Sequence, residues 1–280
     1  GAKRIIYIFL EGGLSQIDSY DYKPDLLKYA GKKLPDSIRP PSFTFAKQGT
    51  VIPSPFAWQQ WGESGTFASD LFPEVNARHI DELCFIHSLH HRSNDHVTAK
   101  RVLHTGVPIE IRPTLGSWLV YGLGSMNENL PAYIDITPTD PNRPTGFLPG
   151  NFGGTAVSRP DKNSPALAWE NLTPQFREQE RHLRFLREIE AANEVDPQLD
   201  EMELAFRMQT EAPGLLDIEN ESEATRKLYG IGEDHTDEFG RALLLARRFS
   251  EAGVRYITVN HASSRYGNLW DQHSELEKGH

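Results

Sequence analysis

The chain has 280 residues, of which 38% are hydrophobic and 24% are charged, a composition that excludes disordered, fibrous and membrane-embedded classes of protein. Its 29 basic and 39 acidic residues give a formal net charge of -10, so the chain offers no overall field that would attract nucleic acid or an anionic membrane surface. The single cysteine excludes an internal disulfide framework and any metal site built from several cysteines.

The first predicted element is a strand over residues 3–10. Its sequence, KRIIYIFL, is rich in β-branched and aromatic residues and is followed by Gly12 and Gly13. An apolar run of this kind is typical of a strand that is buried on both faces, as the strands of parallel sheets are. We therefore expect a parallel sheet, with a loop directly after its first strand.

Helical and strand-like segments alternate along the rest of the chain. The predicted helices cover 70–82, 97–104, 113–122, 171–193, 198–209, 222–228 and 236–252, and the predicted strands cover 42–46, 49–52, 83–86, 132–136 and 254–260. Asn94 or Asp95 is expected to cap the second helix, and Gly106 to end it. The alternation predicts one α/β domain over residues 1–280, with a mostly parallel sheet and helices on both faces.

Residues 137–165 interrupt this alternation. The stretch holds six prolines and four glycines in 29 residues, too many for regular structure. Loops of that length are usually functional or disordered. We expect an irregular, lid-like insertion there.

Candidate ligands follow the predicted strands, beyond whose carboxyl ends open parallel sheets bind their ligands. They are Glu11, Gly12, Gly13, Ser15, Asp18 and Asp21 after the first strand, His87, His90, His91, Asp95 and His96 after strand 83–86, and His261, Asp271, His273 and His280 after the last. Asp271 and His273 form the most specific pair, because residues two apart in an extended segment point to one side. A carboxylate with a neutral imidazole suits zinc, manganese or iron. A single histidine is more often structural, and an Asp-x-His pair also occurs by chance.

The turn Gly12-Gly13-Leu14-Ser15 could form an anion-holding concavity of backbone N–H groups after the first strand. The Ser15 hydroxyl could donate a hydrogen bond to the anion or attack an ester. An ordinary strand-ending turn is the alternative interpretation.

Residues 9–24, FLEGGLSQIDSYDYKP, resemble the opening signature of the family called domain of unknown function 1501. Members of this family are placed by fold in the alkaline-phosphatase and sulfatase superfamily. Further segments are similar to family motifs in family order, at 84–88, 96–106, 115–124, 146–150, 203–209 and 270–273. The resemblance therefore spans nearly the whole chain and implies an alkaline-phosphatase/sulfatase-like fold.

The resemblance implies a metal-dependent hydrolase of phosphate or sulfate esters. Its substrate would be a small-molecule or glycan ester, and its cofactor a divalent metal such as zinc, manganese or calcium. The implied metal ligands are Asp18, Asp271, His273 and Glu11, the last in the place of an aspartate that is typical of the superfamily. The metal would polarise the ester oxygen or supply hydroxide.

Position 96 departs from the sulfatase pattern. Thr105 and Gly106 resemble the helix-ending Thr-Gly of sulfatases, and counting back along that helix places His96 where sulfatases carry a modified cysteine. A formylglycine mechanism cannot operate without cysteine or serine at this position. His96 would instead be a metal ligand, an acid–base group or a phosphorylated nucleophile.

Two other interpretations stay open. A non-catalytic cell-envelope binding or assembly protein would retain the fold without the nucleophile, and the histidine at position 96 favours it. A serine esterase that attacks through Ser15 is the weaker alternative.

The resemblance also bears on the extent and location of the protein. Family members commonly carry a removable leader, often a twin-arginine one, which implies export to the periplasm or the extracellular space. They also continue well past the Trp-Asp-x-His segment, here at 270–273, to a later Asp-His pair that should complete the metal site. We therefore expect the chain to lack the C-terminal part of the functional domain.

Overall fold

The structure is a computed structural model that describes residues 1–38, 49–93, 95–109, 112–136, 145–158, 167–169, 176–190, 197–261, 270–271 and 276–279. The chain divides into two compact units. Unit 1 comprises residues 1–10 and 103–267, and unit 2 comprises residues 11–102 and 268–280. Within the described ranges, no helix is both long and apolar enough to cross a membrane.

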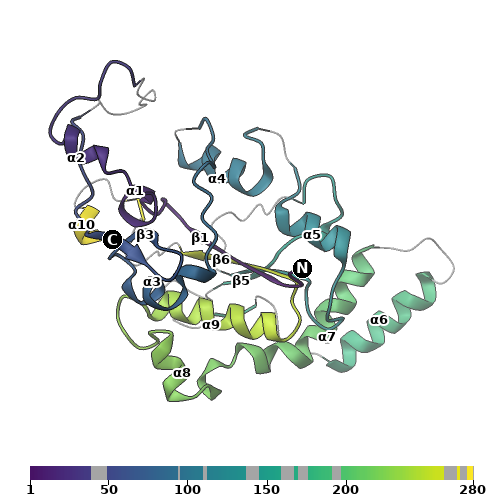
Figure 1. Cartoon of the computed structure of the whole chain (residues 1–280). Helices are drawn as coiled ribbons and strands as arrows, with labels where there is room; N and C mark the ends of the chain where they lie inside the picture. Colours follow the sequence, from purple (N-terminus) through teal and green to yellow (C-terminus); the bar gives the residue numbers. More distant parts are fainter. Residues whose placement is uncertain are drawn as a thin grey trace. The chain divides into compact units, whose positions relative to one another are not determined.

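Unit 1 contains, in its described residues, a parallel sheet of four strands in the order β1-β6-β4-β5 (Figure 1). The strands are β1 (Ile5–Leu10), β6 (Tyr256–His261), β4 (Tyr133–Ile136) and β5 (Thr155–Val157). β1 and β6 pair along their whole length, from Ile5 with Tyr256 to Leu10 with His261, so both end at the same edge of the sheet. The predicted α/β class and parallel sheet are confirmed. The prediction that the first strand is buried on both faces is wrong: in the described residues β1 lies at the edge of the sheet, and Ile6 and Ile8 are 40% and 48% exposed.

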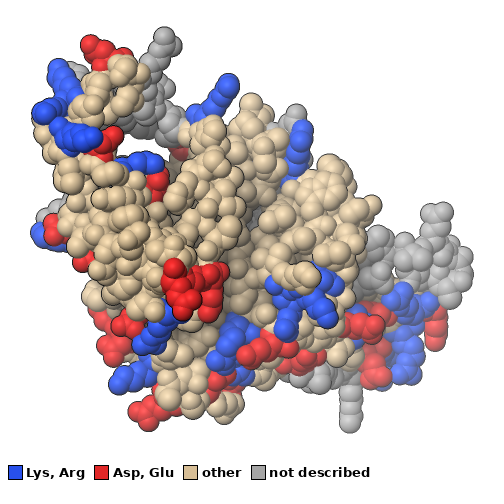
Figure 2. All heavy atoms as spheres, viewed as in Figure 1, with Lys and Arg blue, Asp and Glu red and all other residues tan. Residues whose placement is uncertain are grey.

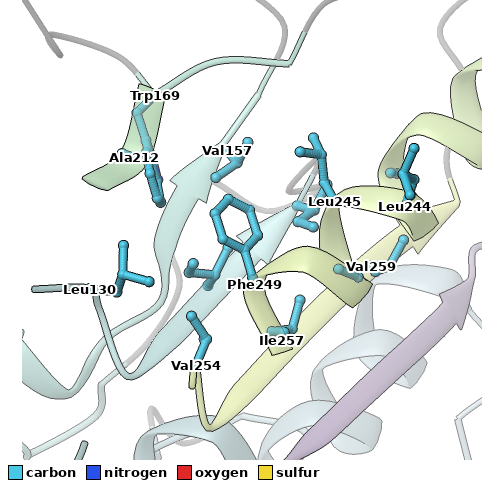
Figure 3. Close-up of a cluster of buried hydrophobic side chains, with 14 of the residues drawn as sticks. Leu130, Val157, Trp169, Ala212, Leu244, Leu245, Phe249, Val254, Ile257 and Val259 are labelled. Carbon is cyan, nitrogen blue, oxygen red and sulfur yellow. The ribbon is translucent and has the colours of Figure 1, made fainter. Parts of the chain in front are cut away.

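Helices cover both faces of this sheet. The side chains of a strand point alternately to its two faces, so the apolar residues of β6 need a packing partner on each face. On one face, Ile257 of β6 belongs to a buried cluster with Phe249 of α9 (Asp237–Glu251), as Figure 3 shows. On the opposite face, the neighbouring Tyr256 packs with Val120 of α5 (Leu115–Leu123). The prediction of helices on both faces is therefore confirmed.

Ion pairs link several of the other helices of unit 1 to one another and to α9. The other helices are η2 (Gly150–Phe152), α6 (Phe176–Glu190), α7 (Pro197–Leu216), η3 (Ile218–Asn220) and α8 (Glu223–Leu228). Glu219 of η3 lies 2.8 Å from Arg226 of α8 and 3.2 Å from Arg241 of α9. In Figure 2, acidic and basic side chains lie side by side over this part of unit 1, so neither sign dominates there.

Unit 2 is built from short helices and an antiparallel hairpin. They are α1 (Gln16–Ser19), α2 (Asp25–Tyr29), the hairpin of β2 (Trp58–Trp61) and β3 (Thr66–Ser69), α3 (Pro73–His79), η1 (Ile80–Glu82), α4 (His96–Thr105) and α10 (Leu276–Gly279). The last three residues of α4 belong to unit 1. The Asp95 carboxylate accepts the N–H of Thr98 at 2.9 Å and caps α4, while Gly106 with a φ of 79° ends it, as predicted.

Several segments differ from the sequence-based expectations. Residues 49–52 are not a strand, and Val51 forms only an isolated bridge with Ala30. Residues 83–86 are not a strand: Leu83 and Ile86 are 40% and 61% exposed, and a short apolar run does not by itself determine a strand. The β2–β3 hairpin was not predicted, because the prolines and glycines around it indicated irregular structure. The strand β5 lies inside the stretch 137–165 that was expected to be irregular. The remaining parts of that stretch, 137–144 and 159–165, and the predicted strand 42–46 lie outside the described residues.

Candidate functional site

The chain leaves β1 through a turn whose glycines allow a close backbone approach. Gly12 and Gly13 have φ angles of 100° and 95°, in the region that favours glycine. A Cβ on Gly12 would overlap the backbone nitrogen of Asp271 and lie 2.7 Å from its Cβ, whereas a Cβ on Gly13 would meet nothing within 4 Å. Gly12 therefore lets residues 270–271 pack directly on the turn after the first strand.

His96 and Asp271 lie next to each other in unit 2, although 175 positions separate them in the sequence. The Nε2 atom of His96 is 3.2 Å from the Oδ2 atom of Asp271. The His96 side chain is 63% exposed, whereas the Asp271 side chain is only 16% exposed. His96 is the first residue of α4, whose N-terminus the Asp95 cap fixes, and hydrogen bonds from Thr98 hold the pKa of Asp95 below its usual range. The ring therefore projects from a fixed helix end and remains accessible.

Lys100 connects α4 to the turn after β1. Its ammonium lies 3.1 Å from the Oε1 atom of Glu11. His96 and Lys100 are four residues apart in α4, a spacing that places them on the same face of the helix. Glu11, Gly12, His96, Lys100 and Asp271 thus form one group, here called the His96 cluster, in which each member contacts or neighbours the next.

Ser15 and Asp18 form a second polar pair in unit 2. The Ser15 hydroxyl donates to the Oδ2 atom of Asp18 at 2.5 Å, and Asp18 is only 2% exposed. The Ser69 hydroxyl of β3 donates to the backbone carbonyl of Asp18 at 2.6 Å. A carboxylate buried to this extent needs a donor such as the Ser15 hydroxyl to offset its lost hydration. In this arrangement the Ser15 proton is directed at Asp18.

The predicted metal ligands are only partly brought together. Asp271 lies against His96, Glu11 is paired with Lys100, Asp18 is paired with Ser15, and His273 lies outside the described residues. Among the residues whose positions are described, no group of three or more His, Cys, Asp or Glu side chains could hold a metal ion.

Sequence reasoning did not single out Lys100 as a site residue. The signal that could have found it is the helical spacing of four from His96, which joins a cation to the predicted histidine on one helix face. The contact between Gly12 and Asp271 had no such local signal, because it depends on how distant segments of the chain pack.

Unit 1 has its own polar groups at the carboxyl ends of its strands. The Asn260 side chain of β6 donates to Asp135 of β4 at 2.7 Å, and both residues are buried. The His261 ring stacks on Phe239 with the centroids 3.9 Å apart, and burial lowers the pKa of His261 to about 4. His261 is therefore neutral at pH 7 in the folded chain.

Comparison with known proteins identifies a family but no activity. The model of the family described as "Protein of unknown function (DUF1501)" matches residues 2–280, which include the whole of the His96 cluster. No curated protein and no solved structure matches the chain.

Proposed function

The chain belongs to the DUF1501 family, and from this premise we propose that it forms part of a metal-dependent hydrolase of phosphate or sulfate esters. The proposal includes an alkaline-phosphatase/sulfatase-like fold, which the resemblance of the sequence motifs supports. It also includes export of the protein, for which that resemblance is the only support.

The observation that carries the proposal is the contact between His96 and Asp271. The sequence points to the two residues for different reasons: His96 by its place at the start of a helix, and Asp271 by its spacing from His273. The distance of 3.2 Å between His96 Nε2 and Asp271 Oδ2 places an imidazole and a carboxylate at the end of α4, next to the turn after β1. Such a pair can serve hydrolysis as metal ligands or as an oriented acid–base group.

The pair fits a divalent metal in its chemistry and spacing. Two donor atoms that each lie about 2.1 Å from one tetrahedral zinc ion are about 3.4 Å apart. The His96–Asp271 separation of 3.2 Å is close to that value. We propose that these two residues hold the ion and that His273, two positions after Asp271, supplies a third donor.

The chain's own residues would bind and orient the ester. A bound divalent ion would supply Lewis acidity and lower the pKa of a water molecule. Hydrolysis forms a bond from the water oxygen to phosphorus or sulfur and breaks the bond to the alcohol oxygen, and the alcohol leaves with one of the water's protons. The N-terminus of α4 would contribute the positive end of the helix dipole, which attracts the anionic group. Ser15 would add a hydroxyl donor if its bond to Asp18 opens.

Metal analysis combined with turnover tests this proposal. The purified full-length protein, with the later Asp-His pair that the resemblance implies, should bind about one zinc or manganese ion with micromolar or higher affinity, and Asp271→Ala and His96→Ala should each lower the metal content at least tenfold. His79→Ala is the matched control, because His79 is also an exposed histidine of unit 2, paired with Glu82. The parent and the control should hydrolyse an aryl phosphate, phosphodiester or sulfate. Absence of metal in the parent chain, or equal metal content in all variants, would refute the proposal.

One observation favours the second candidate, a non-catalytic binding or assembly protein. α4 begins with histidine, and no serine, threonine or cysteine occupies that position as a nucleophile. This candidate predicts a chain that holds no metal at Asp271 and turns over none of the three ester classes.

A further inference from the structure

We infer that Lys100 receives the anionic group of the substrate and that Glu11 is its counterion in the resting state. The inference deepens the proposed function, because it states how the same site would recognise its substrate class. That class is esters that carry negative charge on the phosphoryl or sulfuryl group itself. Neutral carboxylic esters would gain nothing from this residue.

Lys100 is held in an unusual position for a lysine. Its side chain is 19% exposed, whereas the ion-paired Lys23 and Lys28 of the same unit are 51% and 73% exposed. Removing an ammonium from water is unfavourable unless a counterion lies nearby, and Glu11 supplies one at 3.1 Å. The fold therefore keeps a largely buried lysine beside the turn that follows β1.

The position of Lys100 in α4 favours the binding of an anion. Lys100 follows His96 by one helical turn on the same face, in the N-terminal half of a ten-residue helix. The positive end of the helix dipole and the lysine charge act in the same direction there. An anionic oxygen placed near His96 would thus be attracted by the lysine charge and the helix dipole, against the opposing charges of Asp95 and Asp271.

Glu11 would be displaced rather than act as a metal ligand. Its carboxylate is 34% exposed, and partly exposed ion pairs contribute little free energy, so a doubly charged anion can take its place at the ammonium. Glu11 and Asp271 together outnumber the one lysine of the cluster. Removing the charge of Glu11 should therefore strengthen anion binding, whereas the loss of a metal ligand would weaken it.

Calorimetric titration with inorganic phosphate, and separately with sulfate, tests the inference on the whole chain in low salt. We expect Lys100→Met to weaken phosphate binding at least tenfold, Lys100→Arg to retain most of it, and Glu11→Gln to strengthen it severalfold. Lys28→Met is the matched control, since Lys28 also pairs with a carboxylate, at 2.6 Å from Asp25, and should leave binding unchanged.

The outcomes separate this inference from the proposed function. Unchanged binding in Lys100→Met, weaker binding in Glu11→Gln, or no phosphate binding by the parent chain overturns the role of Lys100. Circular dichroism and the retained binding of Lys100→Arg exclude simple unfolding as the cause. If phosphate binding depends on Lys100 but no ester is hydrolysed, the inference stands and the hydrolase proposal fails. If esters are hydrolysed with an unchanged KM in Lys100→Met, the hydrolase proposal stands and the inference fails.

Discussion

Two adjacent glycines show how a single residue controls the candidate site. Gly12 and Gly13 have nearly equal positive φ angles, so an alanine at either position adds backbone strain of about 1 kcal/mol. Only at Gly12 would the new Cβ also overlap the backbone of Asp271. The two positions therefore separate strain in the turn from displacement of Asp271.

We expect Gly12→Ala to reduce metal and phosphate binding at least tenfold, because Asp271 must move away from His96. Gly13→Ala should change metal and phosphate binding by no more than about twofold. Its backbone strain should lower the free energy of unfolding about as much as the strain in Gly12→Ala does. Calorimetric titration and thermal unfolding of the two variants provide the comparison. Equal binding losses in both variants would show that the contact between Gly12 and Asp271 does not position the site.

His261 makes the stability of the folded chain depend on pH. Its pKa falls to about 4 in the folded chain because the ring is buried, compared with 6.5 for an unhindered histidine. A lowered pKa stabilises the fold above pH 6.5, and this contribution is lost as the pH falls towards 4. A pKa shift of this size corresponds to about 3 kcal/mol of pH-dependent unfolding free energy. Because the ring is partly exposed, we expect about 1–2 kcal/mol.

Between pH 7 and pH 4, the parent chain should therefore lose about 1–2 kcal/mol more unfolding free energy than His261→Phe, which can keep the stack on Phe239. Denaturant unfolding of both proteins at both pH values measures the difference, because the titration of all other groups is the same in the parent and the variant. An NMR titration of the His261 ring should have its midpoint near 4. A midpoint near 6.5 would contradict the burial of this ring.

At the scale of elements, the longer apolar or amphipathic segments were predictable, and the strands of three or four residues in proline- and glycine-rich stretches were not. The amphipathic segment 236–252 predicts α9, and the apolar segments 3–10, 132–136 and 254–260 predict β1, β4 and β6. β5 has only three residues and stands in a proline-rich stretch, so it offers no periodicity to detect. Local sequence predicts an element well when its burial pattern repeats over several turns or residues.

Phe249 of α9 tests the importance of this core. The residue is fully buried and its ring lies 5.2 Å from that of Trp169, in the cluster of Figure 3. Phe249→Ala should lower the free energy of unfolding by about 3–5 kcal/mol, through lost apolar burial and the cavity that remains. Phe185→Ala in α6, where the side chain is 57% exposed, should cost less than about 1 kcal/mol. Denaturant unfolding that gave equal losses for the two variants would contradict the described core.

At the scale of the whole molecule, the sequence indicates which segments form the candidate site. It does not indicate which side chains in those segments pair with each other. The sequence pointed to both His96 and Asp271, which lie 3.2 Å apart in unit 2, although the strand 83–86 that His96 was expected to follow is absent. It could not show that Glu11 pairs with Lys100, or that Asp18 is buried against Ser15, because these partners depend on side-chain packing. The composition likewise gives a net charge of -10 but no hint of the cation at Lys100.

The central claim, that Asp271 and His96 hold a metal ion, is tested most directly by crystals of the chain grown with zinc or manganese and measured at the absorption edge of that metal. The account predicts one anomalous peak within about 2.0–2.3 Å of the Asp271 carboxylate and the His96 ring. Crystals that show these two side chains ordered, with no anomalous peak between them at saturating metal, would contradict it.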